Sequence, residues 1–192
     1  MPRALGLLAG ALLALPCAAN ATVVVLQPPG ATGKDTQIDN GAPNTNWEPV
    51  AAVSRYLTVN WQDNNRSIGL IEFDLSSIPG GAAISSATLS LYHELNTCNP
   101  CRYDVFRITS AWTEGTVTYN TAPTIDPVAW ASLVIGDSSA ELYRSWDVTA
   151  LVSAWVNGVY SNFGMWIEEI PVQGTRPPIS RPPIRRPSNI PI

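Results

Sequence analysis

The side chains capable of acid, base or nucleophilic chemistry show no spacing that is specific for catalysis. The sequence has a single histidine, His93. The apolar residues before it alternate along a predicted strand, so its imidazole would lie on the inward side at the end of that strand. A structural role in which the imidazole is hydrogen bonded is therefore favoured over catalysis. No Ser-His-Asp order, zinc-ligand spacing or glycine-rich phosphate-binding loop is present.

Paired carboxylates are a second possible source of catalysis. Two carboxylates about 5 to 10 Å apart are enough for glycoside hydrolysis, and fifteen acidic residues make such a pair easy to find by chance. Glu72 and Asp74 share the outward face of one predicted strand, but a solvated polar face explains them without chemistry. We therefore predict a protein that is not an enzyme.

Oxygen ligands for a calcium ion are available in residues 31–50, a stretch rich in Gly, Asn, Asp, Thr and Pro that predicts mostly loop. Asp35, Asp39 and Asn40 could supply part of the roughly six to eight oxygens that Ca²⁺ requires. Their spacing matches no fixed calcium-binding loop, so Asx-turns are the favoured alternative. Structural calcium is the only cofactor for which the sequence offers candidate ligands.

Cys98 and Cys101 are the only cysteines outside the N-terminal apolar segment. In an oxidising compartment this pair most simply closes a small disulfide-bonded loop between two predicted strands. A redox-active dithiol is the alternative, but that chemistry needs a helix N-terminus beside a parallel sheet, and the sequence predicts neither. We favour the structural disulfide.

Residues 66–92 carry the clearest structural pattern, which is a strand, a turn and a second strand. The residues that alternate toward a core are Ile71, Phe73 and Leu75 in the first strand and Ala87, Leu89 and Leu91 in the second. Pro79, Gly80 and Gly81 separate the two strands. Such one-sided strands cannot bury their apolar faces alone, so a second sheet must lie across from them.

Two strands contain apolar residues of both parities. Ile68 and Leu70 have the opposite parity to Ile71, so a bulge near Gly69 would be needed to turn all of them inward. In the strand expected at residues 102–108, the inward residues would be Phe106 and Ile108, and those facing the other way would be Tyr103, Val105 and Arg107.

Shorter patterns predict the remaining elements. Strands are expected at residues 22–26, 56–61, 129–135 and 163–167. In these strands the inward residues would be Trp61, Met165 and Ile167, and the outward residues would be Trp130 and Trp166. Trp112 would plug the core beneath a long connection. From residue 146 the apolar period becomes helical, with Asp147 as N-cap and Gly158 as the stop, so a short helix should cap one end of the sandwich.

Several separated motifs carry a family resemblance. They are Arg66, FDLSSIP at residues 73–79, Gly81-Ala82, SATLSLY at 86–92, AWTEGTVTYN at 111–120, Pro123, WDVT at 146–149 and WVNG at 155–158. Upstream, DTQI at 35–38 and NTN at 44–46 look like the family's opening segment, although Trp47-Glu48 replaces its usual aromatic-glycine pair. Over roughly residues 22–170, the chain closely resembles the DNRLRE domain family, also called carbohydrate-binding module family 96.

The resemblance implies an all-β, jelly-roll-type β-sandwich and a role in binding polysaccharide. Sugar binding needs flat aromatic faces for the pyranose rings and polar side chains for the hydroxyl groups. The candidates are the aromatic residues that do not fit the predicted core, together with two arginines in nearby strands. They are Trp47, Tyr56, Arg66, Tyr92, Arg107, Trp130 and Trp166. The alternatives are a structural or adhesive surface domain, favoured if Trp47, Trp130 and Trp166 are buried, and then a polysaccharide hydrolase or lyase.

The charge of the sequence argues against several partners. Residues 22–170 contain six basic residues and all fifteen acidic ones, a net charge of −9. An acidic domain repels nucleic acid, and it disfavours anionic polysaccharides unless an arginine cluster or a divalent cation overrides the net field. We expect a polysaccharide partner, no nucleic acid and no membrane partner, and a monomer.

The two ends differ from the domain. Residues 1–21 have the pattern of a secretory signal peptide, with Arg3 before an apolar run and a small-x-small site at residues 19–21, so we expect a secreted, extracellular product. Residues 171–192 form a Pro- and Arg-rich tail that predicts disorder. Members of the family usually finish with a further sheet strand, and this tail contains none.

Overall fold

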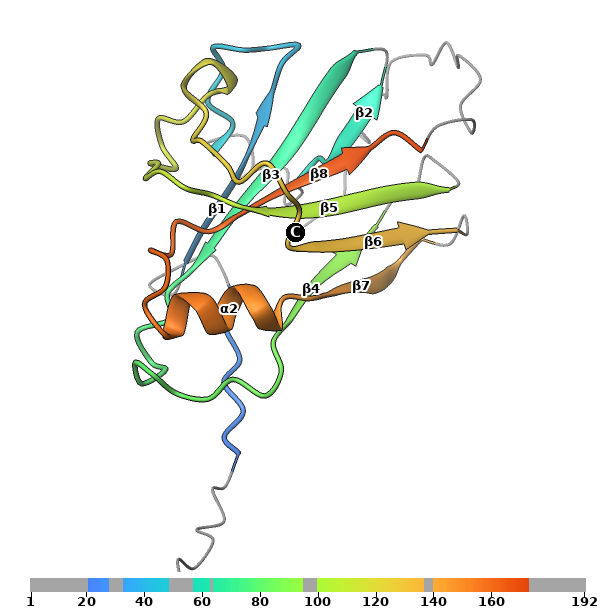
Figure 1. The fold of residues 1–192 in the computed structure, drawn as a ribbon. Coiled ribbons are helices and arrows are strands. Elements are labelled where there is room, and N and C mark those ends of the chain that lie inside the picture. Colours follow the sequence, from blue (N-terminus) through green and yellow to red (C-terminus); the bar gives the residue numbers. More distant parts are fainter. Residues whose placement is uncertain are drawn as a thin grey trace, which may run out of the picture.

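The structure, a computed structural model, describes residues 21–27, 33–48, 57–62, 64–94, 100–136 and 140–172 (Figure 1). The strands are β1 (Gly33–Asp39), β2 (Asn60–Gln62), β3 (Asn65–Phe73), β4 (Thr88–His93), β5 (Cys101–Arg107), β6 (Ala131–Ile135), β7 (Leu142–Asp147) and β8 (Met165–Ile170). Two helical segments accompany them, the 3₁₀ helix η1 (Tyr119–Thr121) and the α-helix α2 (Thr149–Val156). The predicted all-β class with one short helix is confirmed.

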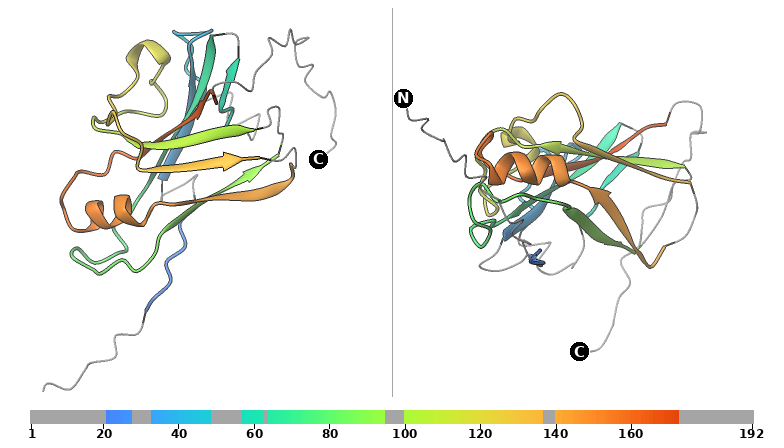
Figure 2. Two further views of the ribbon diagram at one scale, coloured as in Figure 1. Left: turned by 45° about the vertical axis from the view of Figure 1, so that its right-hand side comes forward. Right: turned by 60° about the horizontal axis from the view of Figure 1, so that its bottom comes forward.

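The strands form two antiparallel sheets. In the larger sheet the order is β1-β3-β8-β5-β6, with β2 also paired to β3, and the smaller sheet contains β4 and β7. The smaller sheet and α2 lie together on one side of the larger sheet (Figures 1 and 2). We call this side of the larger sheet its inner face and the opposite side its outer face. The two strands of residues 66–92 thus belong to different sheets, because β3 pairs with β1, β2 and β8 whereas β4 pairs with β7.

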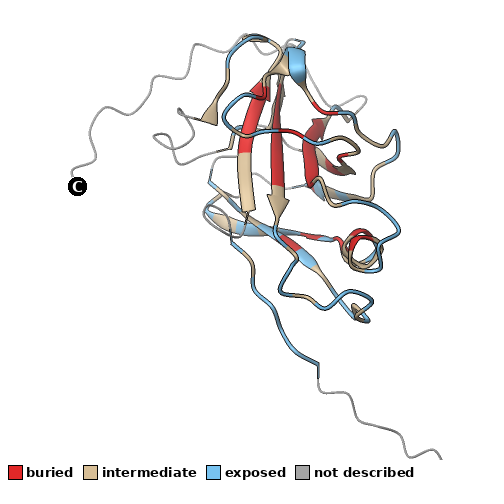
Figure 3. Cartoon of the chain, turned by 90° about the vertical axis from the view of Figure 1, so that its left-hand side faces the viewer, coloured by how far each residue is buried: buried red, intermediate tan, exposed pale blue. Residues whose placement is uncertain are grey.

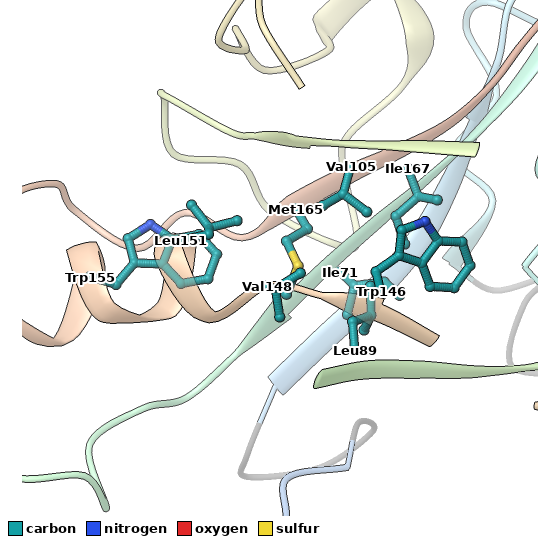
Figure 4. Packing of buried hydrophobic residues seen from close by; sticks show 9 residues of the cluster. All are labelled: Ile71, Leu89, Val105, Trp146, Val148, Leu151, Trp155, Met165 and Ile167. Carbon is teal, nitrogen blue, oxygen red and sulfur yellow. The ribbon is translucent and has the colours of Figure 1, made fainter. Parts of the chain in front are cut away.

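The inner face of the larger sheet packs against β4, β7 and α2. The buried residues of this cluster are Ile71, Leu89, Val105, Trp146, Val148, Leu151, Trp155, Met165 and Ile167 (Figure 4). The inward positions predicted for Met165 and Ile167 are confirmed. Leu151 and Trp155 are the two buried residues of α2, one helical turn apart, so the predicted amphipathic helix closes one end of this layer.

The outer face of the larger sheet is buried as well over much of its area. A second cluster contains Ile38, Ile68, Leu70, Ile108, Trp112, Val117 and Trp166. Trp112 donates its indole N–H to the carbonyl of Phe163 at 2.8 Å, which confirms its predicted role as a core residue beneath the long connection. Buried residues therefore concentrate on the strands of the larger sheet, with a smaller group on α2 (Figure 3).

Burial on both faces corrects two predictions. No bulge occurs at Gly69, because β1 and β3 pair without interruption from Gly33↔Phe73 to Asp39↔Ser67. Ile68 and Leu70 simply face the outer cluster while Ile71 faces the inner one. In β5, likewise, Val105 lies in the inner core although it was expected to face away from it. A strand covered on both sides needs no alternation.

The N-terminal predictions were partly wrong. Residues 21–27 form no strand, and they extend away from the two sheets (Figure 2). Residues 33–39, expected to be loop, form β1 instead. In β1 the buried side chain of Gln37 has a hydrogen-bond partner, because its side-chain oxygen accepts the backbone N–H of Thr58 at 2.7 Å. The described helices include none that is long and apolar enough to cross a membrane.

Candidate functional site

The smaller sheet presents one face to solvent, and its composition follows from the pairing of β4 with β7. Leu89↔Trp146 and Leu91↔Arg144 are partners on the side facing the core. The alternate partners, on the opposite side, are Thr88↔Asp147, Ser90↔Ser145 and Tyr92↔Tyr143. We call these six residues the tyrosine face.

The two tyrosines are direct cross-strand neighbours. Their ring centroids lie 5.3 Å apart with an interplanar angle of 73°, an edge-to-face contact. Tyr92 is 54 % exposed and Tyr143 is 68 % exposed. Large exposed aromatic rings that are held in a fixed relation by their own sheet form a surface to which a ligand ring can stack without further ordering of side chains.

Hydroxyl and carboxylate groups continue the face beyond the rings. The hydroxyls of Ser90 and Ser145 lie 2.9 Å apart and are hydrogen bonded. At the far end, Asp147 accepts hydrogen bonds from the backbone N–H of Thr149 at 2.9 Å and from its hydroxyl at 2.6 Å. These hydrogen bonds lower the pKa of Asp147 from 3.8, so its side chain is a carboxylate above mildly acidic pH. The face therefore offers aromatic, hydroxyl and anionic groups in a row.

Arg107 and Trp130, two predicted sugar-binding residues, meet in a different place. Arg107 donates to both carboxylate oxygens of Asp126, at 2.8 and 2.9 Å, and its guanidinium lies 3.9 Å from the ring centroid of Tyr160. Trp130 donates its indole N–H to Asp126 at 2.9 Å and contacts Tyr160 edge to face at 5.9 Å. Hydrogen bonding to Arg107 lowers the pKa of Asp126. These interactions occupy the polar groups of Arg107 and Trp130 within the protein.

Arg66 and Trp166 share a buried acid on the outer face of the larger sheet. Arg66 forms an ion pair with Glu168, and Trp166 donates its indole N–H to the same carboxylate at 2.9 Å. The Arg66 guanidinium also lies over the ring of Trp61, which is its partner in the β2–β3 pair. Trp61 was expected to be a core residue, and it is not. Trp166 lies on the outer face of the larger sheet, as alternation predicted, but it is only 8 % exposed and so is not the exposed ring expected for sugar binding. The long connection that carries Trp112 covers it.

The other predicted residues are placed as follows. Trp47 is half-buried, and Tyr56 lies outside the described residues. Asp39, a predicted calcium ligand, accepts hydrogen bonds from the hydroxyl of Ser67 and the backbone N–H of Gly41, both at 2.6 Å. Burial and the nearby Glu114 raise the pKa of Asp35. Within the described ranges, no group of three or more His, Cys, Asp or Glu side chains is placed to hold a metal ion.

The predicted disulfide is only partly visible. Cys101 begins β5 and is buried, while Cys98 falls outside the described residues. The pairing of these two cysteines stays a prediction.

Tyr143 was missed because no strand was predicted at residues 142–147. The alternation that would have revealed it is Leu142, Arg144 and Trp146 against Tyr143, Ser145 and Asp147. Trp146 and Asp147 were assigned instead to the start of the helix. Only the pairing with β4 shows that Tyr143 stands beside Tyr92.

An all-β sandwich with paired, exposed aromatic rings beside a row of hydroxyl groups has the features of a ligand-binding module. The model of carbohydrate-binding module family 96 matches residues 30–174, and the chain belongs to this family. This match confirms the family resemblance found in the sequence motifs. A search of curated proteins finds no match to the chain.

Proposed function

We propose that the chain is an exported, non-catalytic polysaccharide-binding domain and that the tyrosine face is its binding surface. The family supports a carbohydrate ligand. The choice of this surface rests on the Tyr92–Tyr143 pair. Both residues are more than half exposed, and their ring centroids lie 5.3 Å apart. Of the predicted sugar-binding residues that the structure describes, Tyr92 is the most exposed.

Stacking of a pyranose ring on an aromatic ring buries apolar C–H surface, and neighbouring hydroxyls exchange hydrogen bonds with those of the sugar. The tyrosine face supplies both kinds of contact on the exposed side of a two-stranded ribbon. An open surface accommodates an extended chain without requiring a free chain end. The ligand is therefore the interior of a polysaccharide.

Affinity electrophoresis tests this proposal. The purified chain, without residues 1–21 after export, would migrate through gels containing different polysaccharides, with and without EDTA. Retardation should occur in at least one gel and should be lost in the double variant Tyr92→Ala/Tyr143→Ala. The matched control is Val134→Ala, which removes an exposed side chain from β6 in the other sheet. Equal retardation of the double variant and the wild type would rule out this surface.

A structural or adhesive role is the second candidate, and the burial of Trp166 favours it. Trp47 and Trp130 are half-buried, so none of the three tryptophans is a free platform. In that case the tyrosine face would contact another protein. Unretarded migration of a folded sample in every gel, together with a binding partner captured from matrix protein, would favour this second function.

From the N-terminal sequence we propose that the chain is exported and that it is cleaved after residue 21. This proposal rests on the apolar run of residues 4–15, which precedes the small-x-small site. N-terminal sequencing of the product from a secreting host should begin at Thr22. Recovery of the chain only in the cytoplasm, with residues 1–21 intact, would contradict the proposal.

A further inference from the structure

One edge of β4 has no strand beside it. In the part of the chain that the structure describes, β4 pairs with β7 alone. The N–H of Val148 donates to the carbonyl of Ala87 at 3.0 Å, and this pair continues the β4–β7 register by one position. Because antiparallel pairs alternate between bonded and non-bonded positions, the backbone groups of Thr88, Ser90 and Tyr92 point away from β7. The described residues supply no hydrogen-bond partner for these groups, and we call this side the free edge of β4.

Other strand edges of the domain are capped or flanked. The N–H of Asp35 in β1 donates to the carboxylate of Glu114 at 2.8 Å. The N–H of Trp61 in β2 donates to the carboxylate of Glu169 at 3.1 Å. The second edge of β7 lies beside β6 (Figure 1). A capped or flanked edge resists the addition of a further strand, whereas an uncapped edge can template one.

The apolar side chains of β4 are only partly covered on the side that faces the core. Ala87 and Leu91 pack against the inner cluster, and both are half-buried. A strand added beside β4 would place every second side chain on this same side. It would therefore bury apolar surface as well as supply backbone hydrogen bonds.

Residues 22–26, with the sequence TVVVL, have the composition of a strand but do not form one. Val23 is 86 % exposed and Val25 is 77 % exposed, and in an extended chain these two alternate residues lie on one face. Leaving such apolar side chains in water is unfavourable. The segment leaves the domain below α2 and points away from β4 (Figures 1 and 2). One molecule thus carries both an unpaired strand segment and an unpaired edge, and the two do not meet.

We infer that residues 22–26 of one molecule add as a third strand to the free edge of β4 in a second copy of the chain. Two copies that exchange these segments about a twofold axis pair both edges, so the assembly closes as a dimer. Val23 and Val25 then face the core side, next to Leu91. The inference does not depend on the proposed polysaccharide ligand. The monomer expected from the sequence is the competing outcome.

Sedimentation equilibrium of the exported chain over a range of concentrations tests the exchange. We expect a reversible dimer, and Val23→Lys/Val25→Lys should weaken its dissociation constant at least about tenfold, because the interface would have to bury two ammonium groups. The matched control is Val128→Lys/Val159→Lys, which adds the same charge at valines that are 72 % and 63 % exposed elsewhere. A monomer at every concentration would overturn the inference. So would dimers of equal strength in the two double variants.

Hydrogen exchange resolved by residue shows where the segment binds. At concentrations that favour the dimer, the N–H groups of Ser90 and Tyr92 should exchange at least about tenfold more slowly than in dilute protein, as should those of residues 22–26. The N–H of Val148, which already donates to Ala87, is the internal control and should not respond to concentration. Protection of residues 22–26 in a monomer would show pairing within one molecule and overturn the exchange. A dimer without added protection at Ser90 and Tyr92 would overturn it as well.

Discussion

Arg107 makes two hydrogen bonds with the carboxylate of Asp126, at 2.8 and 2.9 Å, while its guanidinium lies against the ring of Tyr160. The bidentate geometry joins β5 to the segment that leads into β6, and it fixes Trp130 through the same carboxylate. This arrangement explains why two residues that look suited to a ligand serve the fold. Asp126 and Tyr160 are both remote from Arg107 in the sequence, so this arrangement could not be inferred from local patterns.

The Asp126 carboxylate should make stability depend on pH. Its pKa is lowered in the folded state from an ordinary value of 3.8, so its contribution is fully present above that value and is lost as pH falls through the folded pKa. Asp126→Asn should lower the free energy of unfolding by about 1 kcal/mol at pH 7, because the pair is partly exposed. Urea unfolding at pH 7 and near pH 2 should show a smaller difference between wild type and variant in acid.

A control separates this ion pair from the general effect of charge. Glu141→Gln removes an exposed carboxylate that is not part of this ion pair. Its effect on stability should stay within about 0.5 kcal/mol at both pH values. A destabilisation by Asp126→Asn that is the same at both pH values would contradict the assigned role of the ion pair.

Loss of one tyrosine ring should weaken polysaccharide binding without unfolding the domain. We expect Tyr92→Ala or Tyr143→Ala to weaken affinity about tenfold, equivalent to about 1.4 kcal/mol, since each removes a stacking surface. The free energy of unfolding should change by about 0.5 kcal/mol, the value of an exposed cross-strand pair. Titration calorimetry and urea unfolding measure the two quantities. A variant that binds normally would exclude its ring from the site.

Trp166 should behave in the opposite way. Replacement by Phe removes the indole N–H that donates to the buried carboxylate of Glu168 and leaves that acid with one donor fewer. A hydrogen bond to a charged group contributes about 1.5–3 kcal/mol, so stability should fall by about that amount. Polysaccharide affinity of the folded variant should equal that of the wild type. Weaker polysaccharide binding at unchanged stability would indicate that Trp166 contacts the ligand.

Gly164 should not tolerate a side chain. Its φ is +89°, and a Cβ at this position would collide with the carbonyl oxygen of Ile71. Gly164→Ala should therefore lower the free energy of unfolding by about 2 kcal/mol or more. Gly80→Ala is the matched control, because no heavy atom lies within 4 Å of its added Cβ. Similar thermal midpoints for the two variants would show that the backbone near Gly164 adjusts freely.

The proposed disulfide can be tested on the exported chain. If Cys98 and Cys101 are joined, thiol titration of the denatured, unreduced protein should detect no free thiol. The short loop would contribute about 2 kcal/mol, and the double replacement by Ser should destabilise the domain by that amount. Two titratable thiols in protein recovered from an oxidising compartment would contradict the pairing.

The sequence alone was sufficient for the fold class and for individual elements. The helical period from Val148 to Trp155 predicted α2, and the positions of Met165 and Ile167 followed from alternation. Alternation failed where a strand is buried on both sides. In β3 and β5 the apolar residues of both parities are buried, so parity could not separate core from surface.

The candidate site was less predictable than the fold. Tyr92 was found because its neighbours in β4 alternate clearly, with one face wet. Trp166 has the same parity signal, but a segment about fifty residues earlier in the chain covers it. Exposure of an outward residue depends on what packs over the sheet, and that information is not contained in the strand's own sequence.

The position of β8 affects the order in which the domain can be built. This strand is the last one among the described residues, yet it lies in the middle of the larger sheet, between β3 and β5. Until Met165–Ile170 have left the ribosome, β3 and β5 lack the strand that lies between them and pairs with both. The larger sheet therefore closes only after nearly the whole domain has been synthesised. This order is compatible with the proposed export, because a chain whose core assembles late can pass unfolded through a narrow translocation channel.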